Sequence, residues 1–118
     1  MNLKTVLFGL AAFASVSAAC AQTPGNGLQQ TVSPDQYVTM AQAARQMYVA
    51  GALDADRIYY TQTKPMFAQC LNGVTLAQAT DIVDRSLATL PDYARTAMPI
   101  AVHDALLAAC NRAGYVVQ

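Results

Sequence analysis

Hydrophobic positions recur at helical spacing along most of this chain, beginning after residue 33. Ser33 is a good N-cap and Pro34 is favoured in the first turn of a helix, so a helix is expected to begin here. Gly51 interrupts the pattern and Asp54 can cap a second segment. The range 34–62 is therefore predicted to form one long bent helix or two short ones. Its recurring apolar or small residues are Tyr37, Met40, Ala41, Ala44, Met47, Tyr48 and Ala52.

A turn is predicted between this helical region and the next. Lys64 precedes Pro65, and a residue before proline avoids the helical conformation, so the first region is expected to end there. Asn72-Gly73 is the strongest turn dipeptide in the chain. The range 65–74 is thus predicted to be a turn.

A second helix is predicted to begin after this turn and to run to Pro91. Thr75 and Gln78 have the spacing of a capping box, in which each side chain bonds the other residue's backbone. Asp81 and Arg85 are expected to pair on the outer face. The predicted buried stripe consists of Leu76, Ala79, Ile82, Val83, Leu87 and Leu90.

The last helix is predicted to begin at Pro99 and to be closed by Gly114. A polar connector over 92–96 precedes it, and 115–118 is expected to be a short extended tail packed on the bundle. The expected buried stripe is Val102, Ala105, Leu106 and Ala109, with Cys110 at its end. The fold class is therefore all-α: a small helical bundle.

The first 21 residues have the order of a secretory signal peptide. Lys4 supplies a positive charge, 6–14 is an apolar run broken only by Gly9, and small residues follow over 15–21. The apolar run is too short to span a bilayer stably. We expect cleavage before Gln22, which places the remaining chain in the periplasm.

The rest of the chain is predicted to contain a linker over 22–33 and one domain over 34–118. Two alternatives concern the N-terminal segment. It could remain as an uncleaved anchor helix, although no positively charged flank follows it. Cys20 could instead carry a lipid, although Ser17 stands where a lipid-attachment box usually has Leu or Val.

Cys70 and Cys110 remain as an even pair once the signal is removed. An oxidising compartment favours a disulfide between them. The competing interpretation is a free, reactive Cys70 that acts as a nucleophile. Without Lys4, six basic and seven acidic residues remain, and this net charge of −1 without a basic cluster gives no electrostatic footprint for nucleic acid.

The sequence contains no convincing catalytic set. His103 is the only histidine, and its neighbour Asp104 diverges from it on a helix, so the two cannot form an orienting pair. We expect His103 to be a surface or half-buried residue. The pairs Asp54/Asp56 and Asp81/Asp84 lack further ligands at metal-site spacing and are expected to be solvated charges and caps. No metal, cofactor or catalytic residue is predicted, and the protein is expected not to be an enzyme.

Aromatic and sulfur-containing side chains are mainly core candidates. The six tyrosines and five methionines fit this interpretation. Tyr59, Tyr60 and Tyr93 fall at helix ends or connectors, where such rings often contact partners. A small exported helical domain of this kind is expected to act by binding.

Two short motifs give the chain a family resemblance. The first is Cys70-Leu71-Asn72-Gly73-Val74-Thr75, followed by Gln78, Val83, Leu87, Pro91, Ala105-Leu106 and Cys110. The second has an aromatic residue, a glycine and an aspartate at Tyr48, Gly51 and Asp54. In order and spacing these resemble the Tai/Rap-type family of periplasmic immunity proteins, and the likeness covers 45–112. Members often have another Cys before the position of Tyr48, where this chain has Arg45-Gln46-Met47.

The resemblance implies an all-helical protein, often a homodimer, that neutralises a type VI secretion effector. Such effectors are typically peptidoglycan amidases with a Cys–His active site, and the family blocks them sterically with a loop between helices. The matching connector here would be 89–97, which makes Asp92, Tyr93 and Arg95 the expected contact residues.

Two other functions stay open on the sequence alone. The first is a small periplasmic stress or binding module, such as an acid-stress chaperone, although the chain lacks Lys/Glu-rich amphipathic surfaces. The second is a thiol-dependent enzyme, which would require a reduced Cys70 folded against His103.

Overall fold

Every regular element in residues 31–117, the part that the computed structural model describes, is a helix; no strand occurs among these residues. This confirms the predicted all-α class. The elements are α1 (Pro34–Val38), α2 (Gln42–Tyr59), α3 (Lys64–Cys70), α4 (Leu76–Ser86), two short 3-10 helices η1 (Leu87–Thr89) and η2 (Asp92–Arg95), and α5 (Met98–Arg112). The predicted signal over 1–21, Cys20 and most of the linker 22–33 lie outside the described residues.

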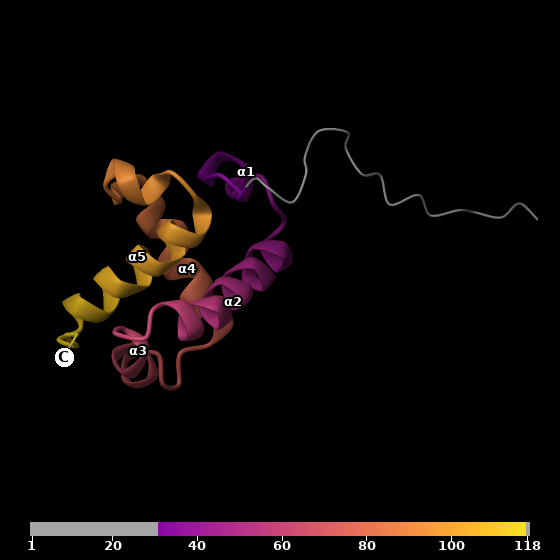
Figure 1. The fold of residues 1–118 in the computed structure, drawn as a ribbon. Helices are drawn as coiled ribbons and strands as arrows, with labels where there is room; N and C mark the ends of the chain where they lie inside the picture. The colour runs from indigo at the N-terminus through magenta and orange to yellow at the C-terminus, as the bar shows by residue number, and fades with distance from the viewer. Residues whose placement is uncertain (1–30, 118) are drawn as a thin grey trace, which may run out of the picture.

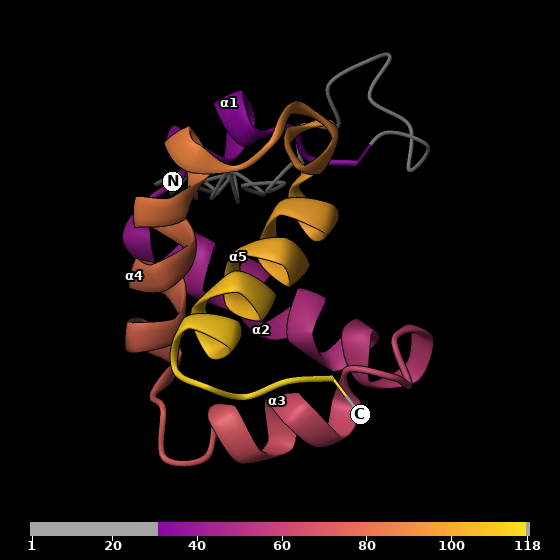
Figure 2. The same cartoon turned by 90° about the vertical axis from the view of Figure 1, so that its left-hand side faces the viewer.

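The helices form a bundle with two distinct ends. Figures 1 and 2 show α2, α4 and α5 packed against one another, with α1 and the connector from α4 to α5 at one end and α3 at the other. The backbone N–H of Met98 donates to the carbonyl of Val32 at 2.8 Å, which ties the segment before α1 to the start of α5. Among the described residues, none of the helices has the length and apolar character that crossing a membrane requires.

The first helical region is two helices, and the break between them differs from expectation. The predicted start is confirmed, because Ser33 and Gln36 form a complete capping box. The chain leaves the helix at 39–41, where the Thr39 hydroxyl donates to the Gln36 carbonyl at 2.7 Å. Gly51 instead lies inside an unbroken α2, and Asp54 caps nothing. Packing of one helix face is sufficient to keep a glycine in a helix.

The prediction of a turn over 65–74 is wrong for most of its length. Lys64–Cys70 is the helix α3, and Pro65 stands in its first turn. Proline lacks only an N–H that has no partner at a helix start, so it begins a helix as readily as it ends one. The turn itself is confined to the residues around Gly73, whose φ of +78° suits glycine. Thr75 and Gln78 then form the predicted capping box.

The second and last helices follow the prediction with shifted ends. α4 stops at Ser86, and the chain tightens into η1 before Pro91. Leu76 is more than one third exposed, whereas Thr80 takes a buried place because its hydroxyl bonds the Leu76 carbonyl at 2.8 Å. Gly114 closes α5 with a φ of +93°, as expected. The tail residues 115–117 are exposed rather than packed on the bundle.

The core gathers around α5, whose buried side chains meet those of α2, α3 and α4. Its fully buried residues are Met98, Ala101, Val102, Ala105, Leu106 and Cys110. Val49 on α2 and Val83 on α4 are also fully buried. Ala44 and Met47, by contrast, belong to the expected apolar stripe of the first region but face solvent, with Met47 71% exposed.

A disulfide joins the end of α3 to α5. The sulfur atoms of Cys70 and Cys110 are 2.06 Å apart and the two Cα atoms 5.7 Å apart, which confirms the predicted pairing. In the chain-entropy model, closing a loop with a sequence separation of 40 residues stabilises a fold by about 4 kcal/mol. The sulfur that a thiol-dependent enzyme would need is therefore consumed in a bond.

Candidate functional site

The connector from η1 to α5 is the segment that carries the expected contact residues. The connector has three buried apolar residues, Leu87, Leu90 and Ala94, and Ala94 is completely buried. The Ala94 N–H donates to the Pro91 carbonyl at 3.0 Å and closes the tight turn of η2. The connector, expected to be an irregular polar loop, is therefore a 3-10 turn fastened to the core by three apolar side chains.

The three predicted contact residues stand together on the outer side of this turn. Asp92, Tyr93 and Arg95 are all exposed, and the ring of Tyr93 is 67% exposed. The Arg95 guanidinium pairs with the Asp92 carboxylate. The Thr96 hydroxyl donates to the Tyr93 carbonyl at 2.8 Å, and this bond helps to hold the backbone of the turn. The structure thus places the three predicted residues on one short turn, η2, in the connector at the same end of the bundle as α1 (Figure 1).

Asp104 on α5 links this surface to the body of the bundle. The Asp104 carboxylate near its hydroxyl raises the pKa of Tyr93. The Oδ2 atom of Asp104 is buried and has no hydrogen-bond partner among the described residues. Tyr93 thereby offers an exposed amphipathic ring to a partner.

The residues of the longer family motif have structural roles at the other end of the molecule. Gly73 supplies the positive φ of the turn, and Thr75 and Gln78 cap α4. Val74 is half-buried and packs against the core. Capping and turn formation account for these residue types, so this motif describes how α3 is joined to α4.

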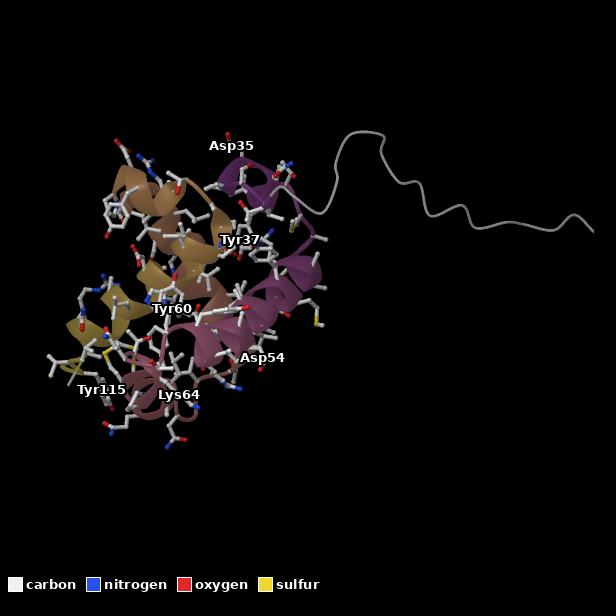
Figure 3. The ribbon with its side chains drawn as sticks, viewed as in Figure 1. Asp35, Tyr37, Asp54, Tyr60, Lys64 and Tyr115 are labelled. Atoms are coloured by element: carbon white, nitrogen blue, oxygen red, sulfur yellow. A yellow bond between two sulfur atoms is a disulfide. The ribbon has the colours of Figure 1, made fainter. Side chains whose placement is uncertain are left out.

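The shorter motif lies along α2 and does not reach the connector. The ring of Tyr48 meets that of Tyr37 edge-on with centroids 5.8 Å apart, and burial raises the pKa of Tyr48. Asp54 is exposed on the outer side of α2, as Figure 3 shows, and pairs with Arg57 at 3.7 Å. Gly51 is exposed as well. Asp54 is thus a solvated charge, as expected.

A buried Asp–His hydrogen-bonded pair was missed by the sequence interpretation. Asp56 and His103 are each 6% exposed, and the His103 Nδ1 lies 3.0 Å from an Asp56 carboxylate oxygen. Tyr60 stacks on the imidazole with centroids 4.0 Å apart, and Phe67 meets it edge-on. The expectation of a surface or half-buried His103 and a solvated Asp56 is therefore wrong. A pair that is enclosed in this way joins α2 to α5.

A helical pattern already in the sequence indicates this burial. His103 shares one face of its helix with Leu106 and Cys110, three and seven positions later, and both are fully buried. Asp56 follows the buried Val49 by two turns in the same way. A polar side chain can be enclosed when a hydrogen-bond partner faces it, as Asp56 and His103 face each other between α2 and α5.

A second polar network ties α1 to α4. The Tyr37 hydroxyl donates to the Asp84 carboxylate at 2.8 Å, and the Arg45 Nε donates to the same carboxylate at 3.2 Å. Burial and the Asp84 hydrogen bond raise the pKa of Tyr37 well above its usual range. Asp84 was expected to be solvated, so this is a further correction. The exposed Asp81–Arg85 pair is present as predicted.

The described residues contain no group of three or more His, Cys, Asp or Glu side chains that could hold a metal ion. Comparison of the chain with family models, with curated protein sequences and with solved structures finds no match. Function is therefore argued from the surface around Tyr93 and from the motif resemblance.

Proposed function

We propose that this chain is exported to the periplasm and acts there as an immunity protein that binds a peptidoglycan amidase effector of type VI secretion. The connector around Tyr93 enters the substrate groove of the amidase and blocks it sterically. The observation that carries this proposal is the position of Asp92, Tyr93 and Arg95, exposed together on a turn whose Ala94 is fully buried.

The anchoring of this turn supports a blocking role in physical terms. Binding orders flexible segments at a cost of about 0.5–1.5 kcal/mol for each side chain that is immobilised. Here the backbone is fixed before binding by η2 and by the bond from Thr96 to the Tyr93 carbonyl. Tyr and Arg are also the residue types that most often dominate interfaces, because they combine large contact area with polar atoms.

The exposed side chains of the connector have the chemical groups that a peptide-binding groove can bind. A peptidoglycan amidase binds a peptide, so its groove offers backbone donors and acceptors and an apolar slot. The Tyr93 ring suits the slot, while the Asp92 carboxylate and the Arg95 guanidinium offer an acceptor and a donor on either side. Because their own ion pair is exposed, replacing it by contacts with the amidase costs little.

The disulfide supports the proposed compartment. Structural disulfides form and persist in oxidising spaces such as the periplasm and are rare in the cytosol. The bond between Cys70 and Cys110 lies in the core and links two helices, so it is structural in position.

The test is inhibition of an amidase encoded beside this chain. We expect the exported protein to stop release of peptide from purified peptidoglycan at one inhibitor per enzyme, and Tyr93→Ala to weaken inhibition at least about 100-fold. Tyr115→Ala is the matched control, because Tyr115 is also an exposed tyrosine but lies at the other end (Figure 3). Full activity of the amidase in the presence of the wild-type chain would refute the proposal.

A second candidate function is an acid-stress chaperone, and the exposed apolar face of α2 is the observation that favours it. Met47 and Tyr59 on this face are 71% and 79% exposed, and such surfaces can hold unfolded clients. This function would appear as suppression of aggregation of an unrelated protein at low pH. Ala55→Glu, in the middle of the face, would then abolish the protection.

A further inference from the structure

A groove lies where α2, α3 and the start of α4 meet, at the end of the bundle opposite the connector. Its volume is about 580 Å³, which falls within the range of sites for small molecules. Its apolar walls come from all three helices and from the turn before α4. They include Leu53, Phe67, Leu71, Val74, Leu76 and Ala79. We call this space the α2–α3 groove.

Packing within the chain leaves these walls incompletely covered. α3 packs against α5, and α4 packs against α2 and α5, so the three helices surround the groove without filling it. Phe67 and Ala79 are buried. Leu53 and Leu71 are only half-buried, and Leu76 is 36% exposed. A ligand in the groove would therefore remove apolar surface from water.

Two cations stand at one end of the groove, beside the turn that joins α2 to α3. Arg57 lies in the last turn of α2, and Lys64, which Figure 3 shows at the α3 end, is the first residue of α3. Arg57 pairs with the exposed Asp54 at 3.7 Å, and Lys64 has no ion-pair partner among the described residues. The acidic residue on the walls, Asp56, is enclosed and hydrogen-bonded to His103. Two exposed positive charges are therefore available to an anion.

We propose that the α2–α3 groove binds a medium-chain fatty-acid anion. The carboxylate lies between Arg57 and Lys64, and the acyl chain follows the apolar walls. At a rise of about 1.5 Å per residue, α3 carries the wall from Lys64 to Leu71 over about 10 Å. An elongated apolar space with cations at one end matches a molecule with one charged end. The site does not depend on the proposed amidase.

The polar groups on the walls favour an acyl chain over a peptide. An extended peptide presents an N–H and a C=O at nearly every residue, and these groups cost free energy when they are buried without partners. The uncharged polar side chains that line the groove are Asn72 and Thr75, and Thr75 is already engaged in the capping box with Gln78. An acyl chain needs no hydrogen bonds and gains from the burial of each CH₂ group.

The experiment is calorimetric titration of the exported protein with dodecanoate below its micelle concentration. We expect one dodecanoate to bind per chain with a dissociation constant below about 1 mM, and the bound ligand to raise the unfolding temperature. In the series octanoate, decanoate and dodecanoate, each added CH₂ should tighten binding by up to about fourfold. Decanol, the neutral analogue of decanoate, should bind about 3–10-fold more weakly.

The role of the two cations is tested by removing both. Arg57→Gln together with Lys64→Gln should weaken dodecanoate binding about 3–10-fold, because each exposed charge contributes modestly. Arg85→Gln together with Arg112→Gln is the matched control, since it removes the same charge from a smaller groove between α4 and α5. The control should bind dodecanoate as the wild type does.

The position of the acyl chain is tested by filling the groove. Ala68 is exposed on α3 and lines the groove, so Ala68→Phe should weaken dodecanoate binding at least about 10-fold through occupied volume. Ala77→Phe, at an exposed alanine of α4 outside the groove, is the matched control and should bind normally. Unfolding temperatures measured without ligand show that both variants are folded.

Four outcomes would overturn the inference. The first is the absence of saturable dodecanoate binding to the wild type. The second is wild-type affinity in Ala68→Phe, which would place the acyl chain elsewhere. The third is loss of binding in the control that lacks Arg85 and Arg112, which would assign the ligand to the groove between α4 and α5. The fourth is equal affinity for decanol and decanoate, which would exclude recognition of the carboxylate.

Discussion

The short helical segments at the two ends of the bundle are held to the core in different ways. At each end a short helical segment joins two longer helices, and each segment was expected to be irregular. α3 is held by the Cys70–Cys110 bond and by the buried Met66 and Phe67. The connector is held by the buried Leu87, Leu90 and Ala94 and by short backbone turns.

This difference separates stability from recognition. At the α3 end, side chains that could do chemistry are enclosed, as His103 is between Tyr60 and Phe67. At the connector end, the anchoring is done by Ala94 and two leucines, which leaves Tyr93 and its polar neighbours free for a partner. Substitutions of enclosed residues at the first end should therefore change folding, and those at the second end should change binding.

The largest effect on folding is expected from removing the disulfide. Replacing Cys70 and Cys110 by serine should lower the free energy of unfolding by about 4 kcal/mol, because the unfolded chain regains the entropy of the open loop. Urea unfolding followed by circular dichroism measures this loss. A double variant as stable and as protective as the wild type would show that the bond does not hold the α3 end together.

The next largest effect is expected at the buried pair of Asp56 and His103. Asp56→Ala leaves His103 enclosed without its partner and should lower the free energy of unfolding by about 3 kcal/mol. Asp54→Ala is the matched control, two residues away on the same helix but exposed, and should change stability by less than about 0.5 kcal/mol. Equal effects of the two substitutions in urea unfolding would contradict the enclosed pair.

A pH-dependent effect is expected from Tyr37, which ties α1 to α4. Its pKa is raised in the folded state, so the stability it contributes is present below the ordinary tyrosine pKa of about 10 and is lost as pH rises above that value. Tyr37→Phe should give a shallower loss of stability on the alkaline side. An unchanged slope of unfolding temperature against pH would show that the hydroxyl is not held by Asp84.

The smallest effect on folding is expected at the connector. Tyr93→Ala removes a ring that is 67% exposed and should change the free energy of unfolding by no more than about 0.5 kcal/mol. Thermal unfolding beside Tyr115→Ala measures this. A loss comparable to that of Asp56→Ala would mean that the ring is part of the core rather than a contact surface.

Local patterns in the sequence were sufficient to predict the helix caps, the end of α5 and the disulfide. Ser33 and Thr75 have partners three residues away, Gly114 ends α5, and Cys70 and Cys110, the two cysteines of the predicted domain, allow one pairing. Each of these depends on neighbours in the chain or on simple counting. They fixed the class of the fold without fixing which face of each helix is buried.

The features that the sequence did not predict depend on how separate elements pack against one another. Proline is compatible with both ends of a helix, so Pro65 alone could not distinguish the end of α2 from the start of α3. Met47 looks like a core residue until α4 and α5 are seen to occupy the other face of α2. His103 and Asp56 are 47 positions apart, and only the packing of α5 on α2 brings them together.

The most direct test of separate recognition and stability is the affinity for the amidase of the proposed function, measured by calorimetry for Tyr93→Ala and Tyr115→Ala alongside their unfolding temperatures. We expect both variants to unfold as the wild type does, Tyr115→Ala to bind normally, and Tyr93→Ala to bind at least about 100-fold more weakly. Wild-type affinity in Tyr93→Ala, or an equal loss in both variants, would contradict a recognition surface at the connector.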